Sequence, residues 1–582
     1  MTTQRTRDPR IAYFSMEIGL ETDIPTYSGG LGVLAGDTLK SSADLALPMV
    51  AVSLLYRKGY FRQEITGDGW QREHPVDWNP AAKMTLLPNR VKVRMEGRDV
   101  HIQAWEYVIQ GESANVDEDK SERQLRVYFL DTDLDINNEW DRGITYHLYG
   151  GDDKYRFRQE VVLGIGGTRM LESLGYKVRK YHMNEGHAAL LTLELMHRFK
   201  QDIEKVWDER KIWDEERVRD LCIFTTHTPV EAGHDRFSHG IVQEVLGDYF
   251  PLEKLREIGS EKEKPDQLNM TTLGLNLSTF HNGVAKKHGE VSRVMFPGYD
   301  IHSVTNGVHT RTWTHPIFAR LYDEFIPNWS NEPELFVRVD NIPDERIWQA
   351  HLEAKRELFA EVKARTGIDM DPEIMTVGFA RRATPYKRAD LLFRDTQRLA
   401  EIGGGKLQVI YAGKAHPRDG GGKEGIHNIF NSAKGLAGQV KVVYLQNYEM
   451  ALALKIIAGV DVWLNTPMRP REASGTSGMK ATHNGVPNFS VLDGWWIEGH
   501  IEGVTGWSIG PEAKETNLND NDERADIEDM YVKLQHILLP LYYKGDNHVA
   551  WIQVMKGAIG KNACYFNTHR MMRSYVTEAY IR

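Results

Sequence analysis

The chain has 582 residues, of which 41% are hydrophobic and 26% are charged, and its formal net charge is −10 at pH 7. This length is too great for one compact core and predicts two domains, while the composition excludes a disordered or fibrous protein. The negative charge gives no support to a nucleic-acid partner.

Cysteine content and hydropathy indicate a reducing compartment. Only Cys222 and Cys564 are present, far apart and without metal-like spacing, which excludes a disulfide framework. The first residues, MTTQRTRDPR, contain no apolar core, and the apolar stretch at residues 451–464 is broken by Lys455 and Asp461. We therefore expect a cytoplasmic enzyme with no membrane span.

The chain opens with a predicted buried strand, IAYFSMEI at residues 11–18, and a glycine-rich turn, YSGGLG. The turn leads into a helix predicted over residues 38–46. Gly30, Gly32 and Ala35 fit a dinucleotide-binding fingerprint, but no acidic residue stands about 20 positions further on to hold a ribose. The helix start remains suited to binding an anion, and the alternative is a packing turn without a ligand.

The following segment, residues 50–63, predicts two strands around a turn at Lys58 and Gly59.

Two histidine-containing segments follow. In HMNEGH, His182, Glu185 and His187 lie close together, but their spacing fits neither common zinc motif, so we expect no metal. TTHTP comes directly after a strand predicted over residues 221–224. His227 therefore stands at a strand's carboxyl end, where open α/β sheets bind ligands; a histidine satisfied within the core is the alternative.

A charged segment, RRATPYKR, directly follows a buried strand predicted over residues 374–380. Most charge runs are solvated faces. The position after a strand of an α/β domain favours a phosphate site instead, because arginine offers phosphate a bidentate fork.

The segment REASGTSGMK combines small residues with a lysine. Its glycines let backbone N–H groups approach an anion, and its hydroxyl groups can donate to one. The helical pattern that begins near Met479 would place Lys480 in the first turn, where the helix dipole disfavours a cation. Lys480 is either a solvated lysine or an amine held beside a phosphate.

Together these segments resemble the α-glucan phosphorylases. EASGTSGMK followed by NGVPNFSVLDG is similar to the motif whose lysine holds pyridoxal 5′-phosphate (PLP), and GGLG, TTHTP, TNGV, RRATPYKR and QNY resemble other family segments in the same order. Nucleotide-sugar glycosyltransferases of the same architecture carry two glutamates around a similar loop. Here Glu472 matches the first glutamate, but Lys480 stands at the second position.

The resemblance implies an α/β fold of GT-B architecture, with two Rossmann-like domains whose parallel sheets face a deep interdomain cleft. We expect an N-terminal glucan-binding domain over residues 1–305 and a C-terminal PLP- and phosphate-binding domain over residues 306–550. A terminal helix, residues 551–582, would pack back on the N-terminal domain.

The same resemblance implies the roles of individual residues. The catalytic residues would be Lys480, Arg382, Lys387 and His227. The cofactor site would comprise Lys480, Tyr448, Thr476, Ser477, Gly30 and Arg381, although the family usually has lysine where Arg381 stands. The substrate would bind Glu472, Ser474, Gly475, Asn306, Leu31 and His187.

The implied reaction is phosphorolysis of terminal α-1,4-glucosyl units of glycogen or maltodextrin to α-D-glucose 1-phosphate, with the PLP 5′-phosphate as proton relay. The expected partners are α-glucan and inorganic phosphate, with no nucleic acid and no membrane. The family is often dimeric, so a homodimer is compatible with the resemblance.

Two other functions remain open. One is a nucleotide-sugar-dependent glucan synthase of GT-B fold, against which Lys480 counts. The other is a catalytically silent glucan-binding homologue. An NAD-dependent oxidoreductase is excluded, because the acidic residue that would bind the ribose of the cofactor is missing.

Overall fold

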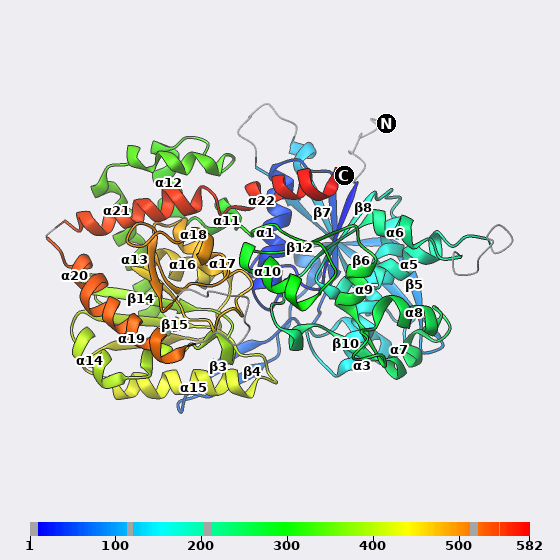
Figure 1. The fold of residues 1–582 in the computed structure, drawn as a ribbon, viewed down its shortest axis with the longest axis horizontal. Helices are drawn as coiled ribbons and strands as arrows, with labels where there is room; N and C mark the ends of the chain where they lie inside the picture. Colours follow the sequence, from blue (N-terminus) through cyan, green and yellow to red (C-terminus); the bar gives the residue numbers. More distant parts are fainter. Residues whose placement is uncertain (1–9, 113–119, 203–211, 512–521, 546, 582) are drawn as a thin grey trace.

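The computed structural model describes residues 10–112, 120–202, 212–511, 522–545 and 547–581. The chain forms two lobes, each built on a sheet that is largely or wholly parallel (Figure 1). Residues 1–9, whose lack of an apolar core supported the sequence prediction of no membrane span, lie outside the described residues. Within the described ranges, no helix is long and apolar enough to cross a membrane.

The N-terminal lobe contains a nine-stranded sheet in the order β13-β12-β9-β8-β1-β2-β7-β6-β5. Its parallel strands are β1 (Ile11–Ser15), β2 (Met49–Leu54), β7 (Gln124–Asp131), β8 (Lys180–Asn184), β9 (Cys222–Thr225), β12 (Phe280–Gly283) and β13 (Ile301–Ser303). At one edge, β5 (Thr85–Met95) and β6 (Arg98–Gln110) add an antiparallel extension. The sheet is therefore mixed, where a parallel sheet was predicted.

Helices cover both faces of this sheet, which explains why every residue of β1 is buried. Alternate side chains of β1 enter different apolar clusters. Tyr13 packs with Leu34 of α1 (Gly30–Asp44), while Phe14 packs in a second cluster with Phe157 of α3 (Asp153–Val161). The other helices of this lobe are α2 (Glu139–Arg142), α4 (Gly167–Ser173), α5 (Leu191–Arg198), α6 (Glu215–Leu221), α7 (His239–Leu246), α8 (Leu252–Gly259), α9 (Met270–Asn276) and α10 (Lys286–Met295).

The C-terminal lobe contains a six-stranded parallel sheet in the order β16-β15-β14-β17-β18-β19. Its strands are β14 (Met375–Ala380), β15 (Leu407–Ala412), β16 (Lys441–Leu445), β17 (Val462–Asn465), β18 (Asn488–Val491) and β19 (Gly506–Ile509). The surrounding helices include α11 (Thr310–Trp313), α12 (Pro316–Phe325), α13 (Asp344–Thr366), α14 (Thr396–Gly403), α15 (Gly420–Gly435), α16 (Met450–Gly459), α17 (Thr476–Thr482), α18 (Trp496–Gly499), α19 (Glu523–Lys533), α20 (Leu539–Tyr542) and α21 (Val549–Gly557). The two lobes confirm the predicted α/β class.

One local prediction was wrong and another was confirmed. The first helix begins at Gly30 and not at residue 38, because the glycines serve close packing within the helix: a Cβ added to Gly36 would lie 1.8 Å from the carbonyl oxygen of Gly19. The two strands predicted within residues 50–63 are present on either side of a turn, but they do not pair with each other. β2 joins the large sheet, while β3 (Arg62–Ile65) pairs with β4 (Gln71–His74) in a separate two-stranded sheet.

The last helices join the two lobes. α22 (Thr568–Tyr575) lies beside α1 in Figure 1, and its Met571, Met572 and Tyr575 share an apolar cluster with Ile11 and Leu34 of the N-terminal lobe. The preceding helix, α21, packs in the apolar cluster of the C-terminal lobe.

A buried ion cluster fixes α13 to the C-terminal sheet. The Nζ atom of Lys355 lies 2.7 Å from Oδ2 of Asp461, and Nε2 of His351 lies 2.7 Å from Oδ1. The N–H of Thr376 also donates to Asp461 at 2.6 Å. The carboxylate therefore connects the helix with the start of β14.

Replacing Lys355 by methionine is expected to lower the free energy of unfolding by about 3–5 kcal/mol, because Asp461 would keep a buried charge without its cation. Urea-induced unfolding followed by tryptophan fluorescence measures this. Lys363, on the same helix, has a side chain that is 63% exposed. Lys363→Met is the matched control and should cost less than about 1 kcal/mol; equal effects of the two variants would contradict the prediction.

Candidate active site

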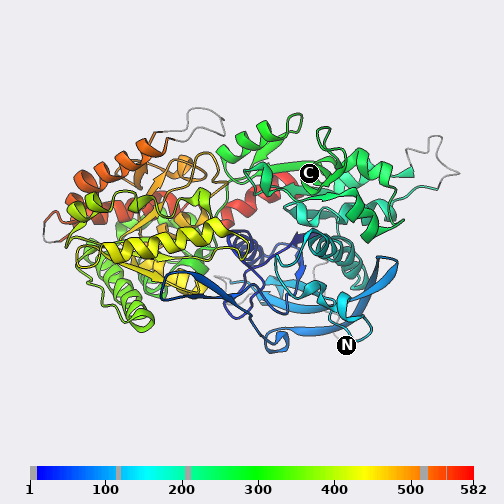
Figure 2. The same ribbon diagram turned by 90° about the horizontal axis from the view of Figure 1, so that it is seen from below.

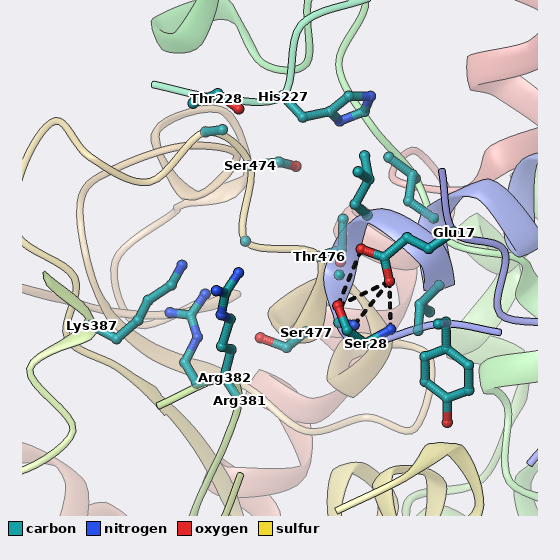
Figure 3. A pocket seen from close by; sticks show the side chains of 18 of the residues that line it. Glu17, Ser28, His227, Thr228, Arg381, Arg382, Lys387, Ser474, Thr476 and Ser477 are labelled. Atoms are coloured by element: carbon teal, nitrogen blue, oxygen red, sulfur yellow. Dashed lines mark hydrogen bonds between the residues drawn. The ribbon is translucent and has the colours of Figure 1, made fainter. Parts of the chain in front are cut away.

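A cavity of about 860 Å³ lies between the lobes and is lined by residues from both. The segments that line it follow the carboxyl ends of strands in the two sheets, including β1, β8 and β9 of one lobe and β14, β15 and β16 of the other. This is the edge at which parallel α/β sheets bind ligands. In Figure 3, Arg381, Arg382 and Lys387 form one wall, and His227 and Thr228 lie across the cavity from them.

The structure brings all the predicted site residues to this one cavity. Those that line it are Gly30, Leu31, His187, His227, Asn306, Arg381, Arg382, Lys387, Tyr448, Glu472, Ser474, Gly475, Thr476, Ser477 and Lys480. They come from segments more than 400 residues apart in the chain.

We call the wall formed by Arg381, Arg382 and Lys387 the cation wall; two of its residues bind Glu472. The Nζ atom of Lys387 donates to both carboxylate oxygens of Glu472, at 2.6 and 2.8 Å, and Nη2 of Arg381 donates to Oε2 at 2.8 Å. Burial raises the pKa of Glu472, but the charges of Arg381 and Lys387 outweigh burial and leave the pKa below its ordinary value. Glu472 is therefore an anion held by two cations.

Asp493 holds the backbone of Glu472 in place. Its carboxyl group accepts the N–H of Glu472 at 2.8 Å and that of Gly494 at 2.9 Å. Burial, together with the nearby charge of Glu472, raises the pKa of Asp493 to about 7. The backbone that carries Glu472 is thus fixed by a second carboxyl group.

Lys480 lies in the second turn of its helix, which corrects the sequence-based position. α17 begins at Thr476, because Gly475 adopts a left-handed conformation (φ 89°) that ends the preceding loop. Lys480 is consequently near the carboxyl end of a short helix, where a cation is favourable. The predicted conflict between the lysine and the helix dipole does not exist.

The amine of Lys480 rests on an aromatic face. Its Nζ atom is 3.8 Å from the ring centroid of Trp313, whose Nε1 donates to Asp37 of α1 at 2.8 Å. Burial lowers the pKa of Lys480 to about 8, although the charge of Asp37 acts in the opposite direction. A substantial fraction of the amine is therefore neutral near neutral pH.

The opposite wall is built by neutral and acidic groups. The N–H of His227 donates to Oε2 of Glu185 at 2.7 Å, and the hydroxyl of Thr228 donates to the same oxygen at 2.9 Å. Burial and neighbouring histidines lower the pKa of His227 to about 3, so the ring is uncharged at neutral pH. Nε2 of His187 lies 3.1 Å from Asp235.

Several buried polar atoms of residues lining the cavity have no hydrogen-bond partner among the described residues. They are Nδ1 of His187, Nε2 of His227, Oδ1 of Asn306, Oγ of Ser474, and Nε and Nη1 of Arg381. Buried polar groups are nearly always paired, so these atoms indicate a polar ligand. Both donors and acceptors are present, as a polyhydroxylated ligand requires.

The cavity suits PLP in its donor set and its free space. A Cβ added to Gly29 or Gly30 would meet no atom within 4 Å, so the start of α1 faces open space with the free N–H groups of a helix terminus. Thr476 and Ser477 add hydroxyl groups, and Lys480 supplies an amine that can be neutral. These residues fit a phosphorylated aldehyde.

Sequence reasoning missed several of the polar residues at this site. Glu17, Glu185, Asp235, Trp313 and Lys414 all line the cavity. Glu17 could have been noticed, because it directly follows the buried strand β1; its Oε2 accepts the N–H of Ser28 at 2.5 Å. Glu185 was considered only as a metal ligand, and among the described residues no group of His, Cys, Asp and Glu is arranged to hold a metal.

Comparison with known proteins agrees with the geometry. Residues 15–127 and 236–506 match the sequence model of the family described as "Phosphorylase: Carbohydrate phosphorylase". The maltodextrin phosphorylase of Thermococcus litoralis is 38% identical, with 98% of this chain and 70% of that protein covered. The glycogen phosphorylase of Aquifex aeolicus is 36% identical (98% and 86%), and that of Mycobacterium tuberculosis 37% (98% and 70%).

The low pKa of Lys480 gives a pH-dependent prediction. With a pKa of about 8, about one-tenth of the amine is neutral at pH 7, against roughly one part in three thousand at the ordinary value of 10.5. The rate at which trinitrobenzenesulfonate, whose own charge does not change between pH 6 and 10, modifies Lys480 in the protein without cofactor should rise with a midpoint near pH 8 and level off above about pH 9. Peptide mass spectrometry across pH 6 to 10 measures it.

Asp37→Asn provides the matched variant for this measurement. Because the charge of Asp37 raises the pKa of Lys480, its removal should move the midpoint to lower pH. A midpoint near 10.5 would show that burial does not control this amine, and a midpoint that Asp37→Asn leaves unchanged would show that the charge of Asp37 does not contribute to its pKa.

Proposed function

Because this chain belongs to the carbohydrate phosphorylase family, we propose that it cleaves terminal α-1,4-glucosyl units with inorganic phosphate and releases α-D-glucose 1-phosphate. One observation carries the proposal: the same cavity holds a cluster of cations and a set of buried polar atoms that lack partners among the described residues. The cations suit a phosphate dianion, and the unpaired atoms suit sugar hydroxyl groups.

Phosphate binds to the cation wall in this proposal. Lys387 and Arg381 already donate to Glu472, so an incoming phosphate competes with that carboxylate for the same donors. The side chain of Arg382 is exposed to the cavity and adds a further cation. Glu472, once displaced, becomes available to accept hydrogen bonds from sugar hydroxyl groups.

The glucosyl unit binds against the opposite wall. Nε2 of His227, Oδ1 of Asn306 and Oγ of Ser474 offer it hydrogen bonds. His227 is uncharged, so it orients a hydroxyl group and does not serve as an acid at neutral pH. Glu185 accepts the backbone N–H of His227 and so fixes the backbone from which the ring extends.

The bond exchange takes place between the two walls. The substrate phosphate gives a proton to the glycosidic oxygen, the bond from that oxygen to C1 breaks, and a phosphate oxygen then bonds to C1 on the same face. The cations hold the phosphate in position and offset its charge. Phosphate is both acid and nucleophile, so the pair of carboxyl groups that a glycoside hydrolase requires is not needed.

PLP is the proposed cofactor, held by Lys480 and surrounded by Tyr448, Thr476, Ser477, Gly30 and Arg381. When bound, it supplies a phosphate group that relays a proton to and from the substrate phosphate. Lys480 anchors it through an amine that burial makes partly neutral. A homodimer and a cytoplasmic location remain predictions from the sequence.

The purified protein, loaded with PLP, should convert maltodextrin to α-D-glucose 1-phosphate only when inorganic phosphate is present. Phosphorus NMR detects the product directly. Chain extension from ADP-glucose or UDP-glucose, without phosphate-dependent cleavage, would establish the synthase instead. Saccharide binding with no turnover of either kind would establish the silent homologue.

Lys387→Ala should lower kcat/KM for phosphate by roughly 100-fold, because a preorganised cation at the reacting phosphate is lost. The KM for maltodextrin should change little. Initial rates at varied phosphate concentration measure the effect. Lys363→Ala, on the surface of α13, is the control, and a Lys387→Ala enzyme with unchanged phosphate kinetics would exclude this role.

A further inference from the structure

The hairpin of β3 and β4 extends from the N-terminal lobe and lies against α15 of the C-terminal lobe (Figures 1 and 2). We propose that Gln63, a buried residue of this hairpin, positions both the phosphate-binding and the cofactor-binding loops of the other lobe. The proposal rests on the proposed function for the identity of those loops. Gln63 itself does not line the cavity, so it acts through the residues that do.

The amide nitrogen of Gln63 holds the loop that follows β15. Nε2 of Gln63 donates to the carbonyl of Gly413 at 2.7 Å and to Oε1 of Gln71 at 2.9 Å. Gln71 in turn donates to the carbonyl of Ala415 at 2.9 Å and accepts the N–H of Ala415 at 2.9 Å. The side chains of the two glutamines thus bind the backbone of residues 413–415 as a neighbouring strand would.

The amide oxygen of Gln63 holds the loop that follows β16. Oε1 of Gln63 accepts the N–H of Asn447 at 2.8 Å, and the N–H of Gln63 donates to Oδ1 of Asn447 at 3.2 Å. Asn447 has a left-handed backbone (φ 56°) and directly precedes Tyr448, the proposed cofactor residue. One side-chain amide therefore connects the two loops.

The loop after β15 transmits this position to the cation wall. The N–H of Ala383 donates to the carbonyl of Lys414 at 2.9 Å, and the N–H of Arg381 donates to that of Ala412 at 3.2 Å. The fit is close, since a Cβ added to Gly413 would lie 2.0 Å from the carbonyl oxygen of Arg381. A displaced loop would move the backbone that carries Arg381 and Arg382.

Other contacts dock the hairpin without Gln63. The ring of Trp70 stacks on His427 of α15 at 4.2 Å, and Lys423 of the same helix pairs with Glu73 at 2.8 Å. Lys414 also donates to the carbonyl of Phe61 at 3.0 Å. A variant at position 63 is therefore expected to keep the hairpin in place and to lose only the alignment of the two loops.

The test compares two buried glutamines of the PLP-loaded enzyme. Gln63→Met removes both amide contacts at similar side-chain volume. The matched control is Gln408→Met: Gln408 is also 1% exposed, and its Nε2 donates to the carbonyl of Asp371 at 2.6 Å near the amino end of β15, away from the cavity. Both variants lose buried hydrogen bonds, so both should lower the melting temperature.

The two variants should differ in kinetics. Gln63→Met should raise the KM for phosphate by roughly tenfold, because misplaced binding groups lose affinity steeply, while the KM for maltodextrin changes less than twofold. Gln408→Met should leave both values near those of the wild type. Gln71→Met removes both side-chain contacts to Ala415 and one hydrogen-bond partner of Gln63. It should raise the phosphate KM as well and serves if Gln63→Met does not fold.

The proposal is overturned if Gln63→Met and Gln71→Met melt earlier but keep the wild-type KM for phosphate, since the hairpin would then be only structural. Calorimetric titration with inorganic phosphate alone gives a second readout that does not need turnover. If the wild type shows no phosphorolysis, the proposed function fails, and phosphate titration of the same variants still decides whether Gln63 positions an anion site.

Discussion

Three cations held together at the end of β14 are the constraint around which the site is built. Neighbouring positive charges repel one another, and the repulsion is stronger when the charges are buried. Arg381 and Lys387 therefore need an anion between them whether or not substrate is present. Glu472 supplies that anion, and Asp493 fixes the backbone of Glu472. The fourth cation of the run, Arg388, turns away and pairs with Asp526 at 2.6 Å in the interior. A single charged segment thus serves both the cavity and the core.

The site also depends on the union of the two lobes. Lys480 belongs to the C-terminal lobe, but Asp37 of α1, in the N-terminal lobe, holds Trp313 against it and contributes to the pKa of its amine. Asp44 of the same helix accepts a hydrogen bond from His309 at 2.8 Å. The electrostatic state of the proposed cofactor lysine is consequently a property of the interface, and neither lobe alone could establish it.

The sequence predicted the family and the α/β class, and both are confirmed. The sequence also identified the site residues that the fold brings to one cavity. This was possible because glycines or charged residues directly after a predicted strand indicate the edge at which parallel sheets bind ligands. The start of α17 was misplaced, since the pattern near Met479 could not show that Gly475 would end the loop earlier. Contacts such as Trp313 with Asp37, or Gln63 with Gly413, join positions 276 and 350 residues apart, and local pattern carries no signal for them. The residues missed at the site are largely of this long-range kind.

The two walls of the cavity divide the chemistry between them. The cations are concentrated on the C-terminal side, where Arg381 and Lys387 surround Glu472. The N-terminal side carries carboxyl groups and His227, whose ring is neutral and has an unpaired nitrogen within the described structure. An anion therefore gains most from one wall and a hydroxylated, uncharged ligand from the other. A phosphate and a glucosyl unit bound in this way meet between the walls, so the bond that is exchanged lies where the two kinds of binding group face each other. The separation also explains why the loops on the cationic side need support from the opposite lobe. An anion is bound tightly only when the hydrogen-bond donors around it point toward it. The hairpin that carries Gln63 holds the backbone of the loops that orient those donors.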